Sequence, residues 1–69
     1  MIKNEQERQR IGARIAELRK ARGMTQMEMA ERCGIFQSNL ARIEGGKYAT
    51  TVDILSRIAD VLGMKVDFV

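Results

Sequence analysis

The chain has 69 residues, of which 30% are charged, and a net charge of +3. This length allows one small domain with a thin core, because a chain of about 60 residues buries only about 60% of its unfolded surface. A partner subunit is a common source of the missing burial. The single cysteine excludes an internal disulfide, and the absence of histidine argues against a metal site and against catalysis by a nucleophile and a histidine base.

The composition also indicates where the protein is found. No apolar run approaches the roughly 20 residues that span a bilayer, and the N-terminal residues 1–7 are too polar for a secretory signal. We expect Cys33 to be a small buried apolar residue, as in proteins of a reducing compartment. The sequence therefore predicts a cytoplasmic protein, located in the nucleoid if it is bacterial.

The first predicted element is a helix of about five turns that ends at Gly23. Asn4 and Glu7 have the spacing of a capping box that opens it. One apolar stripe with helical spacing follows: Ile11, Ile15 and Leu18.

Basic side chains are concentrated in residues 1–24. Against three acidic residues, Glu5, Glu7 and Glu17, this segment carries seven basic ones: Lys3, Arg8, Arg10, Arg14, Arg19, Lys20 and Arg22. A basic first helix could lie near phosphates. For any single arginine, an exposed and solvated helix face is an equally good explanation.

Two short helices are predicted next, joined by a turn at Gly34. Thr25 and Glu28 form a second capping box at the start of one of them. Four residues of this region are expected in the core: Met24, Met29, Ala30 and Cys33. A third helix from about Phe36 to Glu44 would bury Leu40 and Ile43 and break at Gly45-Gly46.

A fourth helix is predicted to start at Thr50, with Asp53 three residues later, and to close at Gly63. Its apolar stripe is Ile54, Leu55, Ile58, Ala59 and Leu62. The sequence thus predicts an all-α domain of four helices over residues 1–63, with a helix-turn-helix unit at about 25–44.

The tail, residues 64–69, changes to an alternating apolar and charged pattern that is typical of a strand. A lone strand leaves its backbone hydrogen bonds unmade. We therefore expect a homodimer in which Met64, Val66 and Phe68 take part in pairing with the same tail of a second copy across a two-fold axis. The alternative is a frayed terminus.

Nothing in the sequence favours an enzyme. Gly45-Gly46 lack the spacing of a phosphate-binding loop, and Glu28 and Glu31 lie on a helix too short to frame a substrate cleft. No cofactor is implied.

The third predicted helix carries residue types that read DNA bases. Glutamine and asparagine pair with adenine and arginine with guanine, and its polar face holds Gln37, Ser38, Asn39 and Arg42. The start of the preceding helix, Thr25-Gln26, could bind a phosphate with its unpaired N–H groups. On composition alone, a merely solvated face is the better explanation, because polar faces of short helices are more often only solvated.

A wider pattern favours DNA binding. The chain, over about residues 8–63, closely resembles the lambda-repressor-like, Cro/XRE-type helix-turn-helix family. The matching positions are Ile11-Gly12, Ile15, Leu18-Arg19, Gly23-Met24-Thr25-Gln26, Met29-Ala30, Gly34-Ile35, Gln37, Leu40, Ile43-Glu44, Gly46-Lys47, Leu55, Ala59 and Leu62-Gly63.

The resemblance implies a role for each matching polar residue. Gln26 would approach a phosphate and brace Gln37, and Lys47 would meet the DNA backbone. Arg19 and Glu44 would form a partly buried ion pair between the first and third helices. The base-contacting positions of the family correspond to Gln37, Ser38, Asn39 and Arg42.

The chain departs from the family pattern in three respects. Phe36 stands where relatives usually have a capping Ser or Thr, so it would either pack on the second helix or touch a thymine methyl. Thr50 stands where many relatives have proline. The fifth helix of many repressor domains is replaced by the strand-like tail, as in some compact antitoxins.

Three functional hypotheses follow. The first is a homodimeric DNA-binding regulator, in the simplest case a repressor, whose third helices read an inverted repeat with half-sites about 34 Å apart or a multiple of that. The second is an antitoxin that also binds a toxin protein. The third is a protein-interaction module that has lost DNA binding.

Overall fold

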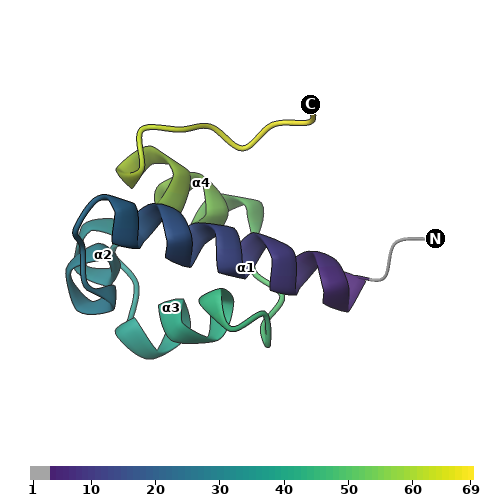
Figure 1. Cartoon of the computed structure of the whole chain (residues 1–69), viewed down its shortest axis with the longest axis horizontal. Coiled ribbons are helices and arrows are strands. Elements are labelled where there is room, and N and C mark those ends of the chain that lie inside the picture. The colour runs from purple at the N-terminus through teal and green to yellow at the C-terminus, as the bar shows by residue number, and fades with distance from the viewer. Residues whose placement is uncertain (1–3) are drawn as a thin grey trace.

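The computed structural model describes residues 4–69 and contains four helices and an extended tail (Figure 1). The helices are α1 (Asn4–Ala21), α2 (Gln26–Cys33), α3 (Gln37–Glu44) and α4 (Val52–Val61). The longest, α1, passes between α4 on one side and α3 on the other (Figure 1). The predicted all-α architecture is confirmed. None of the helices in residues 4–69 is long and apolar enough to cross a membrane.

The predicted capping box of α2 is present. The backbone N–H of Glu28 donates to the Thr25 hydroxyl at 3.1 Å, and the Thr25 N–H donates to the Glu28 carboxylate at 3.0 Å. Gly34 ends the helix in the left-handed conformation with a φ of 71°, which glycine adopts without steric cost. Local sequence signals therefore set both ends of α2.

The predicted caps of α4 and α1 are wrong. The N-cap of α4 is Thr51, whose hydroxyl accepts the N–H of Ile54 at 3.2 Å, and Thr50 lies one residue too early. At the other end of the chain, Asn4 is itself helical. The Glu7 carboxylate accepts hydrogen bonds from Arg10 at 2.8 and 2.9 Å. A nearby guanidinium is a stronger partner for a carboxylate than a backbone N–H.

The core forms where the apolar stripes of the four helices meet. The buried apolar residues are Ile15, Met24, Met29, Ala30, Cys33, Leu40, Ile43, Ile58 and Leu62. Each of them was expected from the helical spacing. The other predicted stripe positions lie half-buried at its edge: Ile11, Leu18, Ile54, Leu55 and Ala59.

A close approach between α1 and α3 occurs at Gly12, which is buried. A Cβ on this residue would overlap the carbonyl oxygen of Ile43 and lie 2.7 Å from that of Glu44. Only glycine lets the two backbones come this close. This contact helps set the position of α3 on the body of the domain.

The predicted C-terminal strand is wrong for this chain. Residues 64–69 have no regular secondary structure, and no β-strand occurs in residues 4–69. A strand requires a neighbouring strand for its hydrogen-bond ladder, and the rest of the fold is helical. The tail instead runs over α4, on the side of the molecule away from α3 (Figure 1).

Candidate nucleic-acid interface

The α2–α3 unit consists of two eight-residue helices joined by a tight turn. The Ile35 N–H donates to the Ala30 carbonyl at 3.0 Å, which closes the turn after Gly34. Leu40 and Ile43 on the inner side of α3 are buried. The opposite side of α3 is left to face outward.

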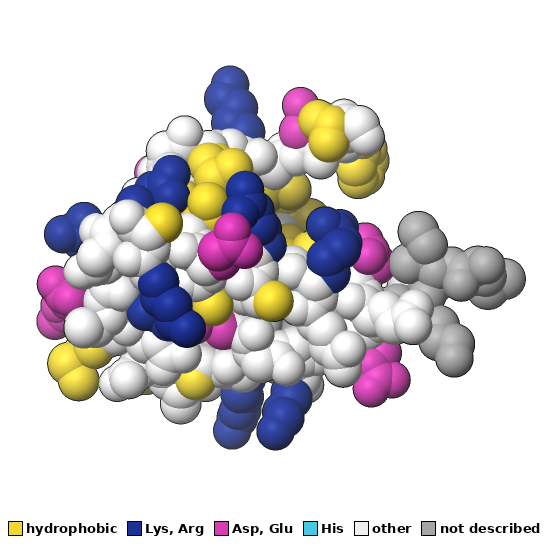
Figure 2. Space-filling model, in the orientation of Figure 1, with side chains coloured by type: hydrophobic (Ala, Val, Ile, Leu, Met, Phe, Trp, Pro, Cys, Tyr) yellow, Lys and Arg dark blue, Asp and Glu magenta, His cyan; other side chains and the backbone are white. Residues whose placement is uncertain are grey.

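The predicted base-contacting residues share this outward side of α3. Gln37, Ser38 and Arg42 are exposed, and Asn39 is half-buried. Within residues 4–69, no hydrogen bond or ion pair occupies their side chains. Figure 2 shows Lys and Arg side chains (dark blue) projecting from the side of the molecule where α3 lies. These donors and acceptors are available to a ligand, and their contacts with DNA remain a prediction.

Phe36 begins α3 without capping it. It occupies the N-cap position, makes no side-chain cap hydrogen bond, and is 84% exposed. The expectation that Phe36 packs on the second helix is therefore wrong. Its ring lies at the end of α3 that carries Gln37 and Ser38, where the remaining expectation, contact with a thymine methyl, stays open.

An ion pair between Arg19 and Glu44 joins α1 to α3, as the resemblance implied. Arg19 Nε and Nη2 donate to the two carboxylate oxygens at 2.8 and 3.0 Å, and the side chains are only 9% and 6% exposed. Arg19 Nη1 also donates to the Met24 carbonyl at 2.8 Å. The hydrogen bonds to Glu44 raise the pKa of Arg19, because they stabilise its charged form.

Gln26 belongs to the same cluster. Its amide donates to Glu44 Oε1 at 3.0 Å, and no hydrogen bond joins it to Gln37. The two glutamines are therefore not paired in this structure, because a carboxylate is a better acceptor than a neutral amide. The contact of Gln26 with a phosphate stays a prediction. The cluster holds α2 and α3 in one orientation relative to α1.

The other predicted phosphate contacts lie at the ends of the unit. Thr25 is exposed at the start of α2, where its hydroxyl accepts the capping hydrogen bond. Lys47 is exposed in the loop after α3, and its backbone N–H donates to the Arg42 carbonyl at 3.1 Å. Both residues stay predicted contacts.

Two structural contributors were missed from the sequence. Arg22 reaches from the end of α1 to the Leu62 carbonyl at 2.9 Å. Gly12 matched a family position, and its role as the close contact of α1 and α3 is visible only in the packing. No group of three or more possible metal ligands occurs in residues 4–69. Cys33 is buried as expected, and burial raises the pKa of its thiol.

Comparison with known proteins agrees with this geometry. The model of a family described as a helix-turn-helix domain matches residues 10–67. The chain belongs to the Cro/XRE-type helix-turn-helix family.

Relatives of this helix-turn-helix protein are named as regulators. It is 38% identical over 56 residues to the immunity repressor protein of Bacillus phage phi105, covering 81% of this chain and 39% of the repressor. It is 41% identical over 49 residues to an uncharacterized HTH-type transcriptional regulator of Methanothermobacter thermautotrophicus, covering 71% of each. The chain thus spans about two fifths of the phage repressor.

Solved structures share the fold of this helix-turn-helix protein. The clp gene regulator ClgR from Corynebacterium glutamicum superposes with a TM-score of 0.81 at 26% identity, over 84% of this chain and 62% of that one. An HTH_3 family transcriptional regulator from Vibrio cholerae superposes with a TM-score of 0.84 at 27% identity. The superposition covers 91% of this chain and 35% of the Vibrio chain. In both cases the similarity extends beyond α2 and α3 to most of the described chain.

Proposed function

We propose that this protein is a sequence-specific DNA-binding transcriptional regulator, in the simplest case a repressor. The observation that carries the proposal is the outward side of α3, where four polar side chains of base-reading type have no partner within residues 4–69. They are Gln37, Ser38, Asn39 and Arg42. The name of the phage immunity repressor supports repression as the sign of regulation.

A rigid support for α3 favours base reading over a merely solvated surface. Direct readout requires a helix held in one orientation in the major groove. The bidentate pair of Arg19 and Glu44 and the close contact at Gly12 both act on the C-terminal end of α3. An α3 held in this way would present its outward side chains to the groove in one orientation.

Phosphate contacts would come from the two ends of the α2–α3 unit. The N-terminus of α2 offers backbone N–H groups and a partial positive charge. The exposed Lys47 follows α3. These contacts would set the position of α3 in the groove and make the affinity dependent on salt.

A homodimer would give the regulator two reading helices. Among the residues that the structure describes, five of the seven exposed large apolar side chains lie at the start of α4 or in the tail: Val52, Met64, Val66, Phe68 and Val69. Figure 2 shows hydrophobic side chains (yellow) on the tail and in the groove below it. This surface lies on the other side of the molecule from α3 (Figure 1). A second copy docked there would bury apolar area and leave both α3 helices accessible to an inverted repeat.

The alternatives use the same surfaces for proteins. The exposed apolar tail would serve an antitoxin as a toxin-binding segment, and the exposed Phe36 would serve a module that binds only proteins. The module that binds only proteins does not account for an unpaired set of base-reading side chains on a fixed helix. The antitoxin hypothesis retains DNA binding and adds a partner, whereas the third hypothesis removes DNA.

The proposal is tested by selecting bound sequences from a random duplex pool at about 150 mM salt. An enriched palindrome with half-sites one or more helical turns apart is the expected result, and affinity for it should fall steeply between about 50 and 200 mM salt. Sedimentation of the Val66→Glu, Phe68→Glu double variant should show a monomer where the parent is a dimer. Failure to enrich any sequence would refute the regulator hypothesis and favour the protein-interaction module.

A further inference from the structure

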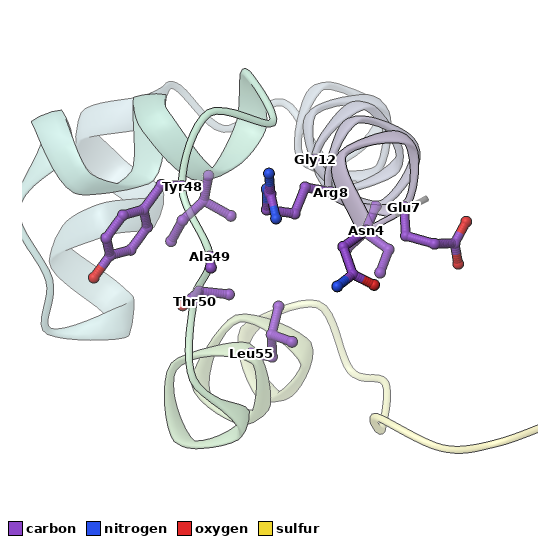
Figure 3. A pocket seen from close by; sticks show the side chains of 10 residues that line it. Asn4, Glu7, Arg8, Gly12, Tyr48, Ala49, Thr50 and Leu55 are labelled. Atoms are coloured by element: carbon purple, nitrogen blue, oxygen red, sulfur yellow. The ribbon is translucent and has the colours of Figure 1, made fainter. Parts of the chain in front are cut away.

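A cavity of about 300 Å³ lies between the first turns of α1, the loop after α3 and the start of α4 (Figure 3). Its lining residues are Asn4, Glu7, Arg8, Ile11, Gly12, Ile43, Tyr48, Ala49, Thr50 and Leu55. None of the side chains predicted to contact DNA lines it. The DNA-binding proposal therefore assigns no role to this cavity.

Arg8 places a charged group in the cavity without a counter-charge. Its side chain leaves α1 toward the segment that carries Ala49 and Thr50 (Figure 3). The Nε atom is buried and has no hydrogen-bond partner. The carboxylate of the neighbouring Glu7 points away from the cavity (Figure 3) and binds Arg10. A buried donor of a charged group without an acceptor is costly, so an acceptor is to be expected here.

Thr50 supplies a second unsatisfied group on the opposite wall. Its Oγ1 is buried and without a partner. The hydroxyl that caps α4 belongs to Thr51, so the Thr50 hydroxyl is not used by the fold. Two residues that line one cavity from different elements, each with a buried polar atom that has no partner, are rare in native proteins, because nearly all buried polar groups find a partner.

The rest of the lining is largely apolar. Ile11, Ile43 and Leu55 come from three different helices and pack at the edge of the core or within it. A site with a few convergent polar groups in an apolar surround is typical of small-molecule binding. A volume near 300 Å³ lies at the lower end of such sites.

We infer that this cavity binds a small organic monocarboxylate. The carboxylate would accept hydrogen bonds from the Arg8 guanidinium and the Thr50 hydroxyl, and its apolar body would contact Ile11, Ile43 and Leu55. A carboxylate matches the planar guanidinium fork and carries one negative charge. A phosphate would bring more charge than the single Arg8 compensates, and would leave the apolar wall unused.

The inference is tested with two probes, benzoate and hexanoate, and their uncharged analogues benzamide and hexanamide. Nitrogen-15 NMR of the full chain follows the Arg8 Nε–H and the backbone amides of Ala49 and Thr50. Both carboxylates should shift these signals saturably, and the amides should bind at least tenfold more weakly. This difference isolates the charged interaction from simple filling of the apolar cavity.

Matched variants assign the effect to Arg8. Arg8→Gln should weaken carboxylate binding at least tenfold, and Thr50→Val a few-fold. Arg14→Gln is the control, because Arg14 lies on the same helix but is exposed and pairs with Glu17 at 2.7 Å; its carboxylate affinity should equal that of the parent. Since Arg8 Nε has no partner in the fold, Arg8→Gln should retain the melting temperature of the parent.

Three results would overturn the inference. One is the absence of a saturable shift with either carboxylate. Another is equal binding of carboxylates and amides, or equal carboxylate binding by the parent and Arg8→Gln. The third is a shift of the Arg8 Nε–H on addition of duplex DNA but not of carboxylates, which would assign Arg8 to a phosphate of the DNA backbone.

Discussion

The guanidinium of Arg19 and the carboxylate of Glu44 form two parallel hydrogen bonds, 2.8 and 3.0 Å long, between the last turn of α1 and the end of α3. Gln26 of α2 donates to the same carboxylate at 3.0 Å. Three helices therefore meet at one charged group. The orientation of α3 depends on this cluster as well as on the apolar core.

Removing one partner of the Arg19–Glu44 pair should strongly destabilise the fold. Arg19→Ala leaves the nearly buried Glu44 carboxylate without its cation, and we expect a loss of about 3–5 kcal/mol of unfolding free energy. The double variant Arg19→Met, Glu44→Leu should lose less than Arg19→Ala, because it leaves no unpaired charge. Urea denaturation of the three proteins measures both differences. An Arg19→Ala protein within about 1 kcal/mol of the parent would contradict the structural role.

The close contact at Gly12 predicts that Gly12→Ala destabilises the fold. Helix propensity alone would make Gly12→Ala stabilising by about 1 kcal/mol. The Cβ would instead overlap the carbonyl oxygens of Ile43 and Glu44, and overpacking of this kind costs about 1–3 kcal/mol. Thermal or urea unfolding should therefore show a destabilised protein with weaker DNA binding. A stabilised Gly12→Ala protein would show that α1 and α3 can separate at no cost.

Phe36→Ser should affect stability and DNA preference in opposite directions. A serine at the N-cap would accept a backbone N–H that Phe36 leaves without a side-chain partner, which stabilises a helix by about 1 kcal/mol. Loss of the exposed ring should reduce the preference for thymine at one position of the site. Phe36→Ala is the control, since it loses the ring without adding a cap. If all three proteins select the same sequences, Phe36 does not contact a base.

Arg42 and Lys47 should differ in the kind of DNA contact that they make. Arg42→Ala should cost about 1–3 kcal/mol at one base position and relax specificity there. Lys47→Ala should weaken binding to all sequences alike and lower the salt slope by about one. Competition binding with single-base variants of the selected site distinguishes the two. An equal loss on every sequence for Arg42→Ala would exclude base reading by this residue.

The capping box of α2 should make stability depend on pH. The backbone N–H and the hydroxyl of Thr25 lower the pKa of Glu28. A carboxyl whose pKa is lower in the folded state stabilises the fold above its unfolded pKa of about 4.3, and this contribution is lost as the pH falls through the folded pKa. The melting temperature of Glu28→Gln, which keeps the hydrogen bonds without titrating, should fall less between about pH 6 and pH 3 than that of the parent. If the melting temperatures of the two proteins fall equally with pH, the capping box does not contribute to the pH dependence of stability.

The elements and the core could be predicted from the sequence because their signals are local. Thr25, Glu28 and Gly34 lie within ten residues of one another and by themselves determine the limits of α2. The helical spacing of Leu40 and Ile43 is enough to place them inside. Since capping and amphipathic spacing act over one or two helical turns, they can be identified without knowledge of the rest of the fold.

The ion pair and the outward side of α3 required more than local pattern. The pairing of Arg19 with Glu44 was implied by the family resemblance, and the structure confirms it. Spacing and the same resemblance predicted the outward polar residues of α3. Their contacts with bases and phosphates depend on a DNA partner and stay predictions.

The choice among chemically similar partners was made by tertiary structure alone. The sequence predicted Thr50 as the cap of α4, whereas the path of the loop after α3 places Thr51 there. Gln26 could have bonded to Gln37, but packing of α2 against α3 brought Glu44 within 3.0 Å. The alternating tail had no strand to pair with, and the unpaired Arg8 and Thr50 came to share one cavity. A hydrogen bond forms only at a short distance and a favourable angle, so its partners are settled only after elements distant in sequence have packed.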